Sequence, residues 1–421
     1  MKKILLIASN CLSKSSNNGK TVASLLSQFG QNNIRQIYFS FSETPDFDLC
    51  HSYYRLSDID IMKGIFKKNC GHIIRRELTE SEVKANKRNY IVNYGKKLLT
   101  PFMRDTIWYF SKWKSPMLMQ WIYEFAPDVI FFVGGYSWFS NNIAVKLSVS
   151  LNIPLVSYYT DDYVLYSIPQ NPLSSIIKKR RIHIYKRTIS HSHLRYVIGE
   201  EMASAYNDYW HKEFIPIMNS VDIYPYQPKN TSEKLAISYF GGLHLYRWKS
   251  IALLAKLLPK NCNINIYTQS DITEEISIAF STLPNVNFCG SVYGTELIQS
   301  MQNSDMLLHI ESNDKYYRRL TKLSVSTKIP EYLISSRPIL AFGPTEVASI
   351  KLLKDNNIGY VVDIDGTESL IKEQLAHIYQ DRANFAKVSL KGYNYAITKF
   401  DKKKISEMVF NQICSICRDP K

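Results

Sequence analysis

Short apolar runs alternate with longer stretches in which apolar residues recur every three or four positions, along most of the chain. The short runs predict buried strands, and the stretches between them predict amphipathic helices. Strands separated by helices indicate parallel sheets with right-handed crossovers. In the first half, the predicted strands lie at residues 3–8, 36–41, 128–133, 155–159 and 196–198.

A polar segment that contains Pro225 and Pro228 interrupts this alternation, and we interpret it as a linker. A second series of predicted strands follows, at 235–240, 263–267, 286–288, 306–309, 338–342 and 359–362.

The pattern therefore predicts an α/β fold with two doubly wound, Rossmann-like domains that face a cleft. The expected parts are a domain at 1–224, a domain at 231–393 and a terminal helix at 394–421. Because ligands of doubly wound sheets bind beyond the carboxyl ends of the strands, we expect the site in that cleft.

Length and composition agree with two soluble domains. A chain of 421 residues exceeds the size that one core usually reaches. The apolar run at 4–8 is too short for a signal peptide, and no run has the length needed to span a bilayer. Seven scattered cysteines fit a reducing compartment, so we expect a cytoplasmic protein.

The net charge of +15 is concentrated in two stretches. Residues 63–114 hold thirteen Lys or Arg against four Asp or Glu, and residues 178–187 hold six basic residues without an acid. Such patches attract anionic lipid, nucleic acid or a pyrophosphate. We expect no nucleic-acid partner, because no motif of that kind is present. Aromatic residues within the first stretch and just after it fit either the inner surface of a membrane or a core helix face: Trp108, Tyr109, Phe110, Trp113 and Trp121.

Two features of the first half stand at predicted strand ends. Gly19 precedes Lys20 and Thr21 in half of a P-loop motif, since Lys14 occupies the position of its first glycine. A glycine there still allows backbone N–H groups to approach an anion or a sugar. Asp161 and Asp162 are candidate catalytic carboxylates that would orient a hydroxyl or stabilise positive charge, or else they cap a turn.

The second half carries more specific signals. Gly241 and Gly242 follow a strand and permit close backbone approach, and Arg247 and Lys249 supply charge for a diphosphate. A later helix start combines residues that suit phosphate and ribose: Ser326, Thr327, Lys328 and Glu331. A capped helix explains the hydroxyls and the glutamate equally well, but a lysine at a helix start is unfavourable without an anion.

The segments 241–247, 283–292 and 326–344 resemble GT-B fold glycosyltransferases of the retaining, family-4-like kind, which include many that build bacterial capsule and lipopolysaccharide. The resemblance is looser in the first half, at 16–21, 153–162 and 202–206.

This resemblance implies roles for individual residues. Arg247 would neutralise the donor diphosphate with Lys249 or Lys328, and Glu331 would bind the ribose. Ser326 and Thr327 would meet the phosphates, and the final helix would return to the first domain. The residues near the base would be Gly290, Ser291 and Val292. The family usually has two acids with seven residues between them, of which Glu331 would be the second. The first would fall at Leu323, and Glu311 is a weak substitute.

The resulting hypothesis is a cytoplasmic glycosyltransferase that needs no metal or other cofactor. It would move a sugar, with retention, from a nucleotide-diphosphate sugar to a lipid-linked or other saccharide acceptor in surface polysaccharide synthesis. The alternatives are a sugar-nucleotide epimerase of the same fold and a non-enzymatic nucleotide-binding partner in the same pathway.

Overall fold

The computed structural model describes residues 1–14, 17–41, 43–64, 70–74, 76, 100–167, 169, 171–230 and 232–417. The chain forms two compact units, Met1–Ile217 with Lys404–Lys421, and Met218–Lys403. Each unit contains one sheet of predominantly or entirely parallel strands with helices between them, so the predicted α/β fold with two doubly wound domains is confirmed.

In the first unit, the described strands form a sheet in the order β4-β3-β2-β1-β5-β6-β7-β8. Neighbouring strands run parallel except for β3 and β4, which are antiparallel. The strands are β1 Ile4–Ala8, β2 Ile34–Tyr38, β3 Ser52–Arg55, β4 His72–Ile74, β5 Val129–Val133, β6 Leu155–Tyr159, β7 Leu194–Val197 and β8 Ile215–Pro216. The helices are α1 Asn17–Leu25, α2 Asp58–Gly64, α4 Thr100–Phe110, α5 Pro116–Phe125, α6 Trp138–Leu151, α7 Pro172–His191, α8 Gly199–Trp210 and α17 Lys402–Ile416, with 3-10 turns at Ser27–Phe29 and Gln31–Asn33.

Strand β1 shows why this sheet is buried on both faces. Its five residues are all apolar, and successive side chains of a strand point to opposite faces. Ile4 and Leu6 join one hydrophobic core, whereas Leu5 and Ile7 join the other. An unbroken apolar run is therefore what a central parallel strand requires.

In the second unit, the described strands are all parallel, in the order β11-β10-β9-β12-β13-β14. They are β9 Leu235–Phe240, β10 Cys262–Tyr267, β11 Val286–Phe288, β12 Met306–Ile310, β13 Ile339–Gly343 and β14 Tyr360–Asp363. The helices are α9 Arg247–Leu257, α10 Glu274–Phe280, α11 Gly294–Asn303, α12 Lys315–Leu320, α13 Lys328–Ile334, α14 Ala348–Asp355, α15 Glu368–Gln380 and α16 Phe385–Lys399, with a 3-10 turn at Asp381–Asn384.

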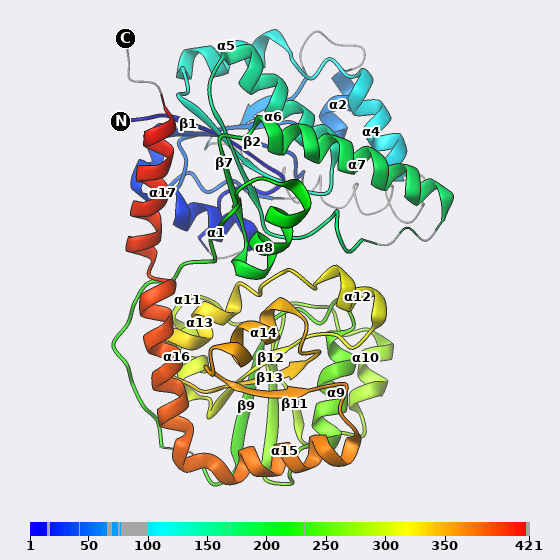
Figure 1. Cartoon of the computed structure of the whole chain (residues 1–421), viewed down its shortest axis with the longest axis vertical. Helices are drawn as coiled ribbons and strands as arrows, with labels where there is room; N and C mark the ends of the chain where they lie inside the picture. Colours follow the sequence, from blue (N-terminus) through cyan, green and yellow to red (C-terminus); the bar gives the residue numbers. More distant parts are fainter. Residues whose placement is uncertain are drawn as a thin grey trace. The chain divides into compact units, whose positions relative to one another are not determined.

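The C-terminal segment differs from the single helix expected at 394–421. The chain leaves helical geometry between α16 and α17, where Val221 N donates to Phe400 O and Lys402 N donates to Val221 O. Helix α17 then lies beside the sheet of the first unit (Figure 1), with Val409 and Ile413 buried in its core.

The division between the units falls at Ile217, before the predicted linker. The segment around Pro225 follows the second unit because Tyr226 Oη contacts Ala386 O and Ser389 Oγ.

Each sheet has one point at which the strand order reverses. In the first unit this switch point lies between β1 and β5, and in the second unit it lies between β9 and β12. Crevices for ligands form beyond the carboxyl ends of the strands at such points. These two places are therefore where each unit is expected to hold a ligand.

Candidate functional site

The switch point of the second unit begins with Gly241 and Gly242, directly after β9. A Cβ atom added to Gly241 would lie 2.9 Å from Tyr239 Oη, and one added to Gly242 would overlap the His244 ring. The space beside both glycines is thus occupied by side chains of the same unit. The groups that closely approach these two glycines are therefore side chains of the same unit.

Arg247 is the first residue of α9 and pairs with Glu311, which follows β12. Its Nη2 atom lies 3.3 and 3.4 Å from the two carboxylate oxygens. The side chains are 19% and 3% exposed, respectively. Burial by itself lowers the pKa of the guanidinium, but the negative charge of Glu311 outweighs it and the pKa is raised. Arg247 therefore stays cationic in a mostly buried position.

The backbone that leads into α9 is strained. Leu245 and Tyr246 have φ values of 60° and 57°, in the left-handed region. This conformation costs a non-glycine residue about 1–3 kcal/mol, so the surrounding packing must hold it. The strained turn places Arg247 at the start of the helix beside the end of β12.

His309 lies on the other side of Glu311. Its Nε2 atom is 3.5 Å from Glu311 Oε1, and its side chain is almost fully buried. Burial lowers the pKa of the imidazole to about 4, although the carboxylate opposes this. His309 is therefore neutral near pH 7. The sequence analysis did not single it out, although a histidine and a glutamate at the end of an apolar strand were a visible signal.

The start of α13 gathers Ser326, Thr327, Lys328 and Glu331. Lys328 Nζ donates to Glu331 Oε2 at 2.9 Å, one helical turn away. The lysine thus has a negatively charged neighbour in its own helix, which removes the reason to infer a bound anion from its position alone. Lys328 N contacts Ser326 Oγ at 3.3 Å, and Thr327 O accepts from Asn219 Nδ2.

A buried tyrosine fixes α13 against the end of β9. The hydroxyl of Tyr332 accepts a hydrogen bond from Phe240 N at 3.0 Å and lies 3.2 Å from Phe240 O. Phe240 is the residue before Gly241. The structure consequently brings α13, with Lys328 and Glu331, to the same edge of the sheet as Arg247.

Lys249 is oriented differently from Arg247. Its Nζ atom lies 3.8 Å from the centre of the Tyr246 ring and 5.1 Å from that of Trp248. It is also 3.8 Å from a carboxylate oxygen of Glu275. These contacts hold the ammonium over aromatic rings, and they do not join it to Arg247 and Glu311.

The residues predicted near a base lie on an edge loop. Gly290 and Ser291 are exposed and Val292 is half-buried, and all three follow β11. Gly290 has a φ of 76°, which favours glycine, and its carbonyl accepts from Thr268 N at 2.7 Å. This loop occupies the carboxyl edge of the same sheet as Arg247, with β10 between β11 and β9.

The switch point of the first unit holds a cavity of about 180 Å³ beyond the ends of β1 and β5. One water needs about 10–15 Å³ of such space, so the cavity has room for several water molecules. The described residues that line it are all apolar or uncharged polar. They are Leu6, Ala8, Ser9, Asn10, Leu12, Asn18, Gly19, Val22, Gln36, Val133, Gly134, Gly135, Tyr136, Ser137 and Tyr163.

The loop above this cavity is held by Gln36, which sequence reasoning did not identify. Its Nε2 donates to Asn10 O at 2.8 Å, and its Oε1 accepts from Leu12 N at 2.9 Å. A Cβ atom at Gly19 would overlap Cys11 O. Helix α1 can therefore reach this loop only with glycine at position 19.

The two adjacent aspartates have different environments. Asp162 is buried and accepts hydrogen bonds from three successive backbone N–H groups, of Val164, Leu165 and Tyr166, and from the hydroxyl of Tyr206. This is the arrangement of a turn cap. Asp161 is half-buried and accepts from Thr160 Oγ1 and from Tyr163 Oη, the latter at the cavity wall.

The aromatic residues near the basic stretches separate into two groups. Trp108, Trp113 and Trp121 belong to the hydrophobic core, whereas Tyr109 and Phe110 are exposed on α4. For the three tryptophans, the core alternative is therefore the one observed. Of the basic stretch 63–114, residues 65–69, 75 and 77–99 lie outside the described residues.

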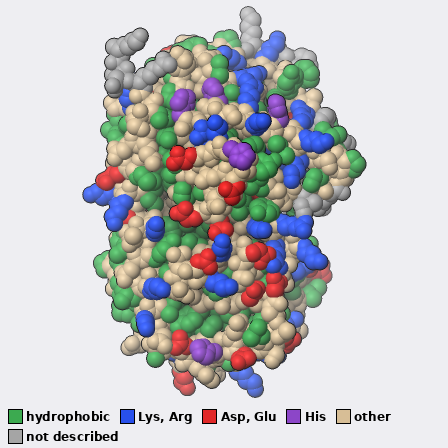
Figure 2. Space-filling view, viewed as in Figure 1, with side chains coloured by type: hydrophobic (Ala, Val, Ile, Leu, Met, Phe, Trp, Pro, Cys, Tyr) green, Lys and Arg blue, Asp and Glu red, His purple; other side chains and the backbone are tan. Residues whose placement is uncertain are grey.

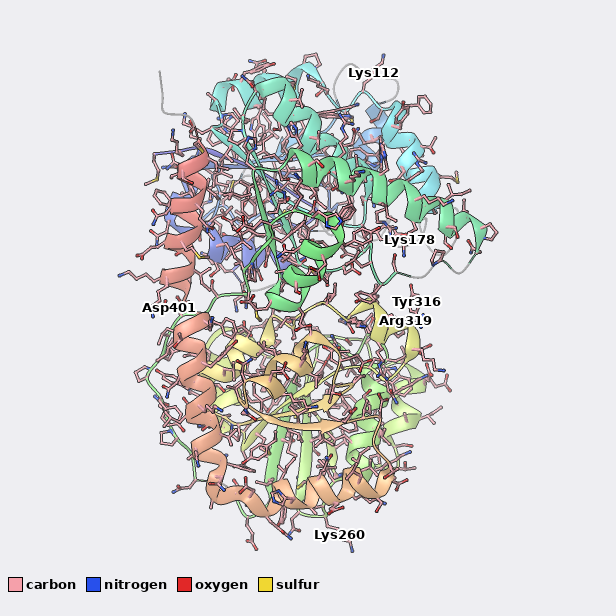
Figure 3. All side chains as sticks on the ribbon, in the orientation of Figure 1. Lys112, Lys178, Lys260, Tyr316, Arg319 and Asp401 are labelled. Carbon is pink, nitrogen blue, oxygen red and sulfur yellow. The ribbon has the colours of Figure 1, made fainter. Side chains whose placement is uncertain are left out.

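Basic side chains of the first unit are distributed over separate elements. Lys112 follows α4 and Lys178 lies in α7 (Figure 3). On the face shown in Figure 2, lysine and arginine are interspersed with acidic and hydrophobic side chains in both units. Arg181, in the second basic stretch, is buried and donates to Tyr163 O.

Within the described part of the chain, no three potential metal-binding side chains come together. The Asp58 and Asp60 carboxylates are engaged by Arg104 and Ser57. None of the helices in the described ranges is both long and apolar enough to cross a bilayer.

No family model and no curated protein matches the sequence. Solved structures do match over nearly the whole chain. HepE of Anabaena in complex with UDP is 13% identical, with a TM-score of 0.64 over 98% of this chain and 100% of that one. Sucrose-phosphate synthase from Thermosynechococcus elongatus is 13% identical, with a TM-score of 0.66 over 99% of this chain and 100% of that one.

WaaG, a glycosyltransferase involved in lipopolysaccharide biosynthesis, is 11% identical, with a TM-score of 0.55 over 96% of this chain and 99% of that one. At these identities the likeness concerns the fold. The chain shares with these proteins an architecture of two α/β domains with parallel sheets.

Proposed function

We propose that this protein is a glycosyltransferase that moves a sugar from a nucleotide-diphosphate sugar to a saccharide acceptor. The observation that carries the proposal is the placement of Arg247, Lys328 and Glu331 at the carboxyl edge of one sheet, at its switch point. Structures of the same fold add support, since HepE was solved with UDP and with UDP-glucose.

In this proposal the donor diphosphate lies against Arg247, with Lys328 and the hydroxyls of Ser326 and Thr327 around the phosphates. Lys328 is paired with Glu331 in the ligand-free chain. Donor binding then exchanges partners, because the lysine turns to a phosphate oxygen while the carboxylate accepts hydrogen bonds from the two ribose hydroxyls. One rearrangement of this ion pair thus creates both contacts.

The chemical step breaks the bond between the sugar C1 and the diphosphate oxygen and forms a bond from C1 to the acceptor oxygen. The electron pair of the broken bond stays on the diphosphate, where Arg247 and Lys328 stabilise the negative charge. The acceptor proton passes to the departing phosphate oxygen. Attack from the same face as the leaving group retains the configuration at C1. Since cationic side chains serve the leaving group, the proposed step uses no metal.

The acceptor is proposed to enter the cavity of the first unit. Its uncharged wall of amides, hydroxyls and Tyr136 suits the hydroxyl groups and the C–H face of a sugar. Asp161 contacts Tyr163 at this wall and is the carboxylate we assign to orienting an acceptor hydroxyl. The carboxylate oxygens of Asp162 already accept hydrogen bonds from the backbone of the turn, so we assign this residue a structural role.

A lipid-linked acceptor would require contact with the inner membrane surface, for which we propose α4 and the chain after it. Phe110 is 77% exposed, and Tyr109 and Met103 are also exposed on this helix. Exposed aromatic residues close to Lys112 and Lys114 suit an anionic interface. Sedimentation with phosphatidylglycerol vesicles should decrease in Phe110→Ser. It should be unchanged in Ile278→Ser, which alters another exposed apolar residue, in the second unit.

The test of the donor site is calorimetric titration of the purified protein with UDP, GDP, ADP and CMP, in buffer with a chelator. One nucleoside diphosphate should bind, and Glu331→Ala should weaken it about tenfold through the lost ribose contacts. The control is Glu368→Ala, because Glu368 also pairs with a lysine of its own helix, Lys372, but at an exposed position. Absence of binding by every nucleotide would remove the donor site from the proposal.

A further inference from the structure

Two buried polar groups behind Arg247 have no task in the transfer step described above. Glu311 contacts Arg247 on one side and lies close to His309 on the other. Among the described residues, Arg247 Nε and His309 Nε2 are buried without a hydrogen-bond partner. A buried nitrogen atom without a hydrogen-bond partner lowers the stability of the fold. Two such atoms in one cluster therefore suggest a role in binding or catalysis.

The fold makes specific room for this cluster. A Cβ atom at Gly343, the last residue of β13, would lie 2.9 Å from Glu311 Cβ. Glu311 itself is fixed by its backbone N–H, which donates to Phe342 O. The backbone and Cβ of Glu311 are therefore fixed against β13, and its carboxylate lies beside Arg247.

The charges of the cluster cancel in the free protein. Arg247 is cationic, Glu311 is its counter-ion and His309 is neutral. The other groups that face Arg247 and Glu311 include two tyrosines with pKa values raised by burial and a histidine whose pKa is lowered by burial. These are Tyr239, Tyr332 and His244, with Glu331 next along α13. An arriving diphosphate consequently meets a neutral cluster and adds net negative charge to it.

We propose that Glu311 and His309 position Arg247 and together take up one proton when a nucleoside-diphosphate group binds to it. The inference rests on the proposed donor site. Phosphate and carboxylate then share one guanidinium, and neighbouring negative charges in a buried place favour protonation. His309 Nε2, at 3.5 Å, receives that proton and donates to Glu311. The proton belongs to the pair as a whole.

The experiment is calorimetric titration with UDP-glucose, or the sugar nucleotide of whichever base binds, at pH 7.5 in two buffers of different ionisation enthalpy. Both phosphates of such a donor are esterified, so the ligand itself exchanges no proton near neutral pH. The difference in heat gives the number of protons taken up. We expect about one, and a dissociation constant that falls about tenfold per unit decrease in pH.

Substitutions of His309 and Glu311 test whether these residues take up the proton or only pack against Arg247. His309→Asn and Glu311→Gln should bind with proton uptake close to zero. Glu346→Gln is the matched control, because it removes another carboxylate paired with an arginine, Arg318, in the same unit. It should retain uptake of about one proton.

Two results overturn the inference. Binding by the wild-type protein without proton uptake does so while leaving the donor site intact, and this measurement needs no variant to fold. Weaker binding by His309→Asn and Glu311→Gln with uptake still near one would mean that these residues act through packing alone. If no sugar nucleotide binds the wild-type protein, the donor site fails together with the inference.

Discussion

The two switch points occupy equivalent places in their sheets but differ in charge. Near the switch point between β9 and β12, Arg247 pairs with Glu311 and Lys328 pairs with Glu331, and the carboxylate of each pair is mostly buried. Between β1 and β5, a cavity of about 180 Å³ is lined by uncharged groups among the residues described. The same topology thus provides one place suited to an anion and another suited to a neutral, hydroxyl-rich molecule.

The largest effect is expected at the charged switch point. Arg247→Ala removes the guanidinium and leaves Glu311 as an unpaired buried carboxylate. Loss of charge-assisted hydrogen bonds should weaken binding of the nucleoside diphosphate by about 100- to 1,000-fold in a titration. Lys249→Ala should change binding less than threefold, because Lys249 lies over aromatic rings. Equal losses of nucleotide affinity in the two variants would contradict the different roles assigned to Arg247 and Lys249.

After β6, next to the uncharged switch point, the two aspartates should affect different properties: Asp162 the stability of the fold and Asp161 the transfer activity. Asp162→Ala removes the acceptor of three backbone N–H groups, so the free energy of unfolding should fall by about 3 kcal/mol in urea. Asp161→Asn should leave that free energy nearly unchanged and reduce the transfer rate. The assignment is wrong if Asp161→Asn is the less stable protein of the two.

Two glycines that line the cavity of the first unit should differ in their tolerance of a methyl group. Gly19→Ala overlaps Cys11 O and should lower the free energy of unfolding by about 2 kcal/mol. Gly135 lines the same cavity, and its nearest neighbour would be Ser9 Oγ at 3.6 Å. Gly135→Ala should therefore cost much less, as measured by thermal unfolding of both variants.

Acid should destabilise the charged switch point through His309. The unfolded histidine binds a proton below about pH 6.5, whereas the pKa in the folded chain is about 4. Stability from this group is therefore complete above pH 6.5 and falls as the pH decreases toward 4. Between pH 7.5 and pH 5, the wild-type protein should lose about 1–2 kcal/mol more than His309→Asn. Identical losses would show that folding does not lower the pKa of His309, which would contradict this prediction.

In the first unit, Asp105 should affect the pH dependence of stability in the opposite direction to His309. Burial raises the pKa of Asp105 to about 6, against the nearby charges of Arg180, Arg104 and Arg181. The folded chain then binds a proton more readily than the unfolded chain, so this group adds stability as the pH falls from about 6 to 4. Asp105→Asn should remove about 1 kcal/mol of this gain, measured by urea unfolding at pH 7 and pH 5.

Much of the fold could be predicted from apolar periodicity. Central strands such as β1 and β5 are buried on both faces and appear as continuous apolar runs. The strands β3, β4 and β8 were missed, because short strands at or near a sheet edge are less apolar and carry half-buried polar residues such as His72. The break at Phe400 was also missed, since it depends on hydrogen bonds to the distant Val221.

The candidate site was predicted in its residue types but not in its pairings. Arg247 and Lys328 were identified because cations after glycine-rich or hydroxyl-rich turns are typical of phosphate sites. Glu331 was identified as a carboxylate near a helix start, where it suits a ribose. That Glu311 neutralises Arg247, and that Lys328 pairs with Glu331, follows from contacts across strands and within a helical turn. A linear motif cannot distinguish Asp161 from Asp162 either, because the difference lies in which backbone N–H groups surround each carboxylate.

The central claim is that the nucleotide binds at the charged switch point and not at the uncharged one. Hydrogen–deuterium exchange of the protein with and without a saturating nucleoside diphosphate tests this most directly. We predict slower exchange at 241–249 and 326–332, and unchanged exchange at 9–25 and 134–137. Protection confined to the segments around Gly19 and Gly135 would contradict the account, because the nucleotide would then occupy the cavity of the first unit.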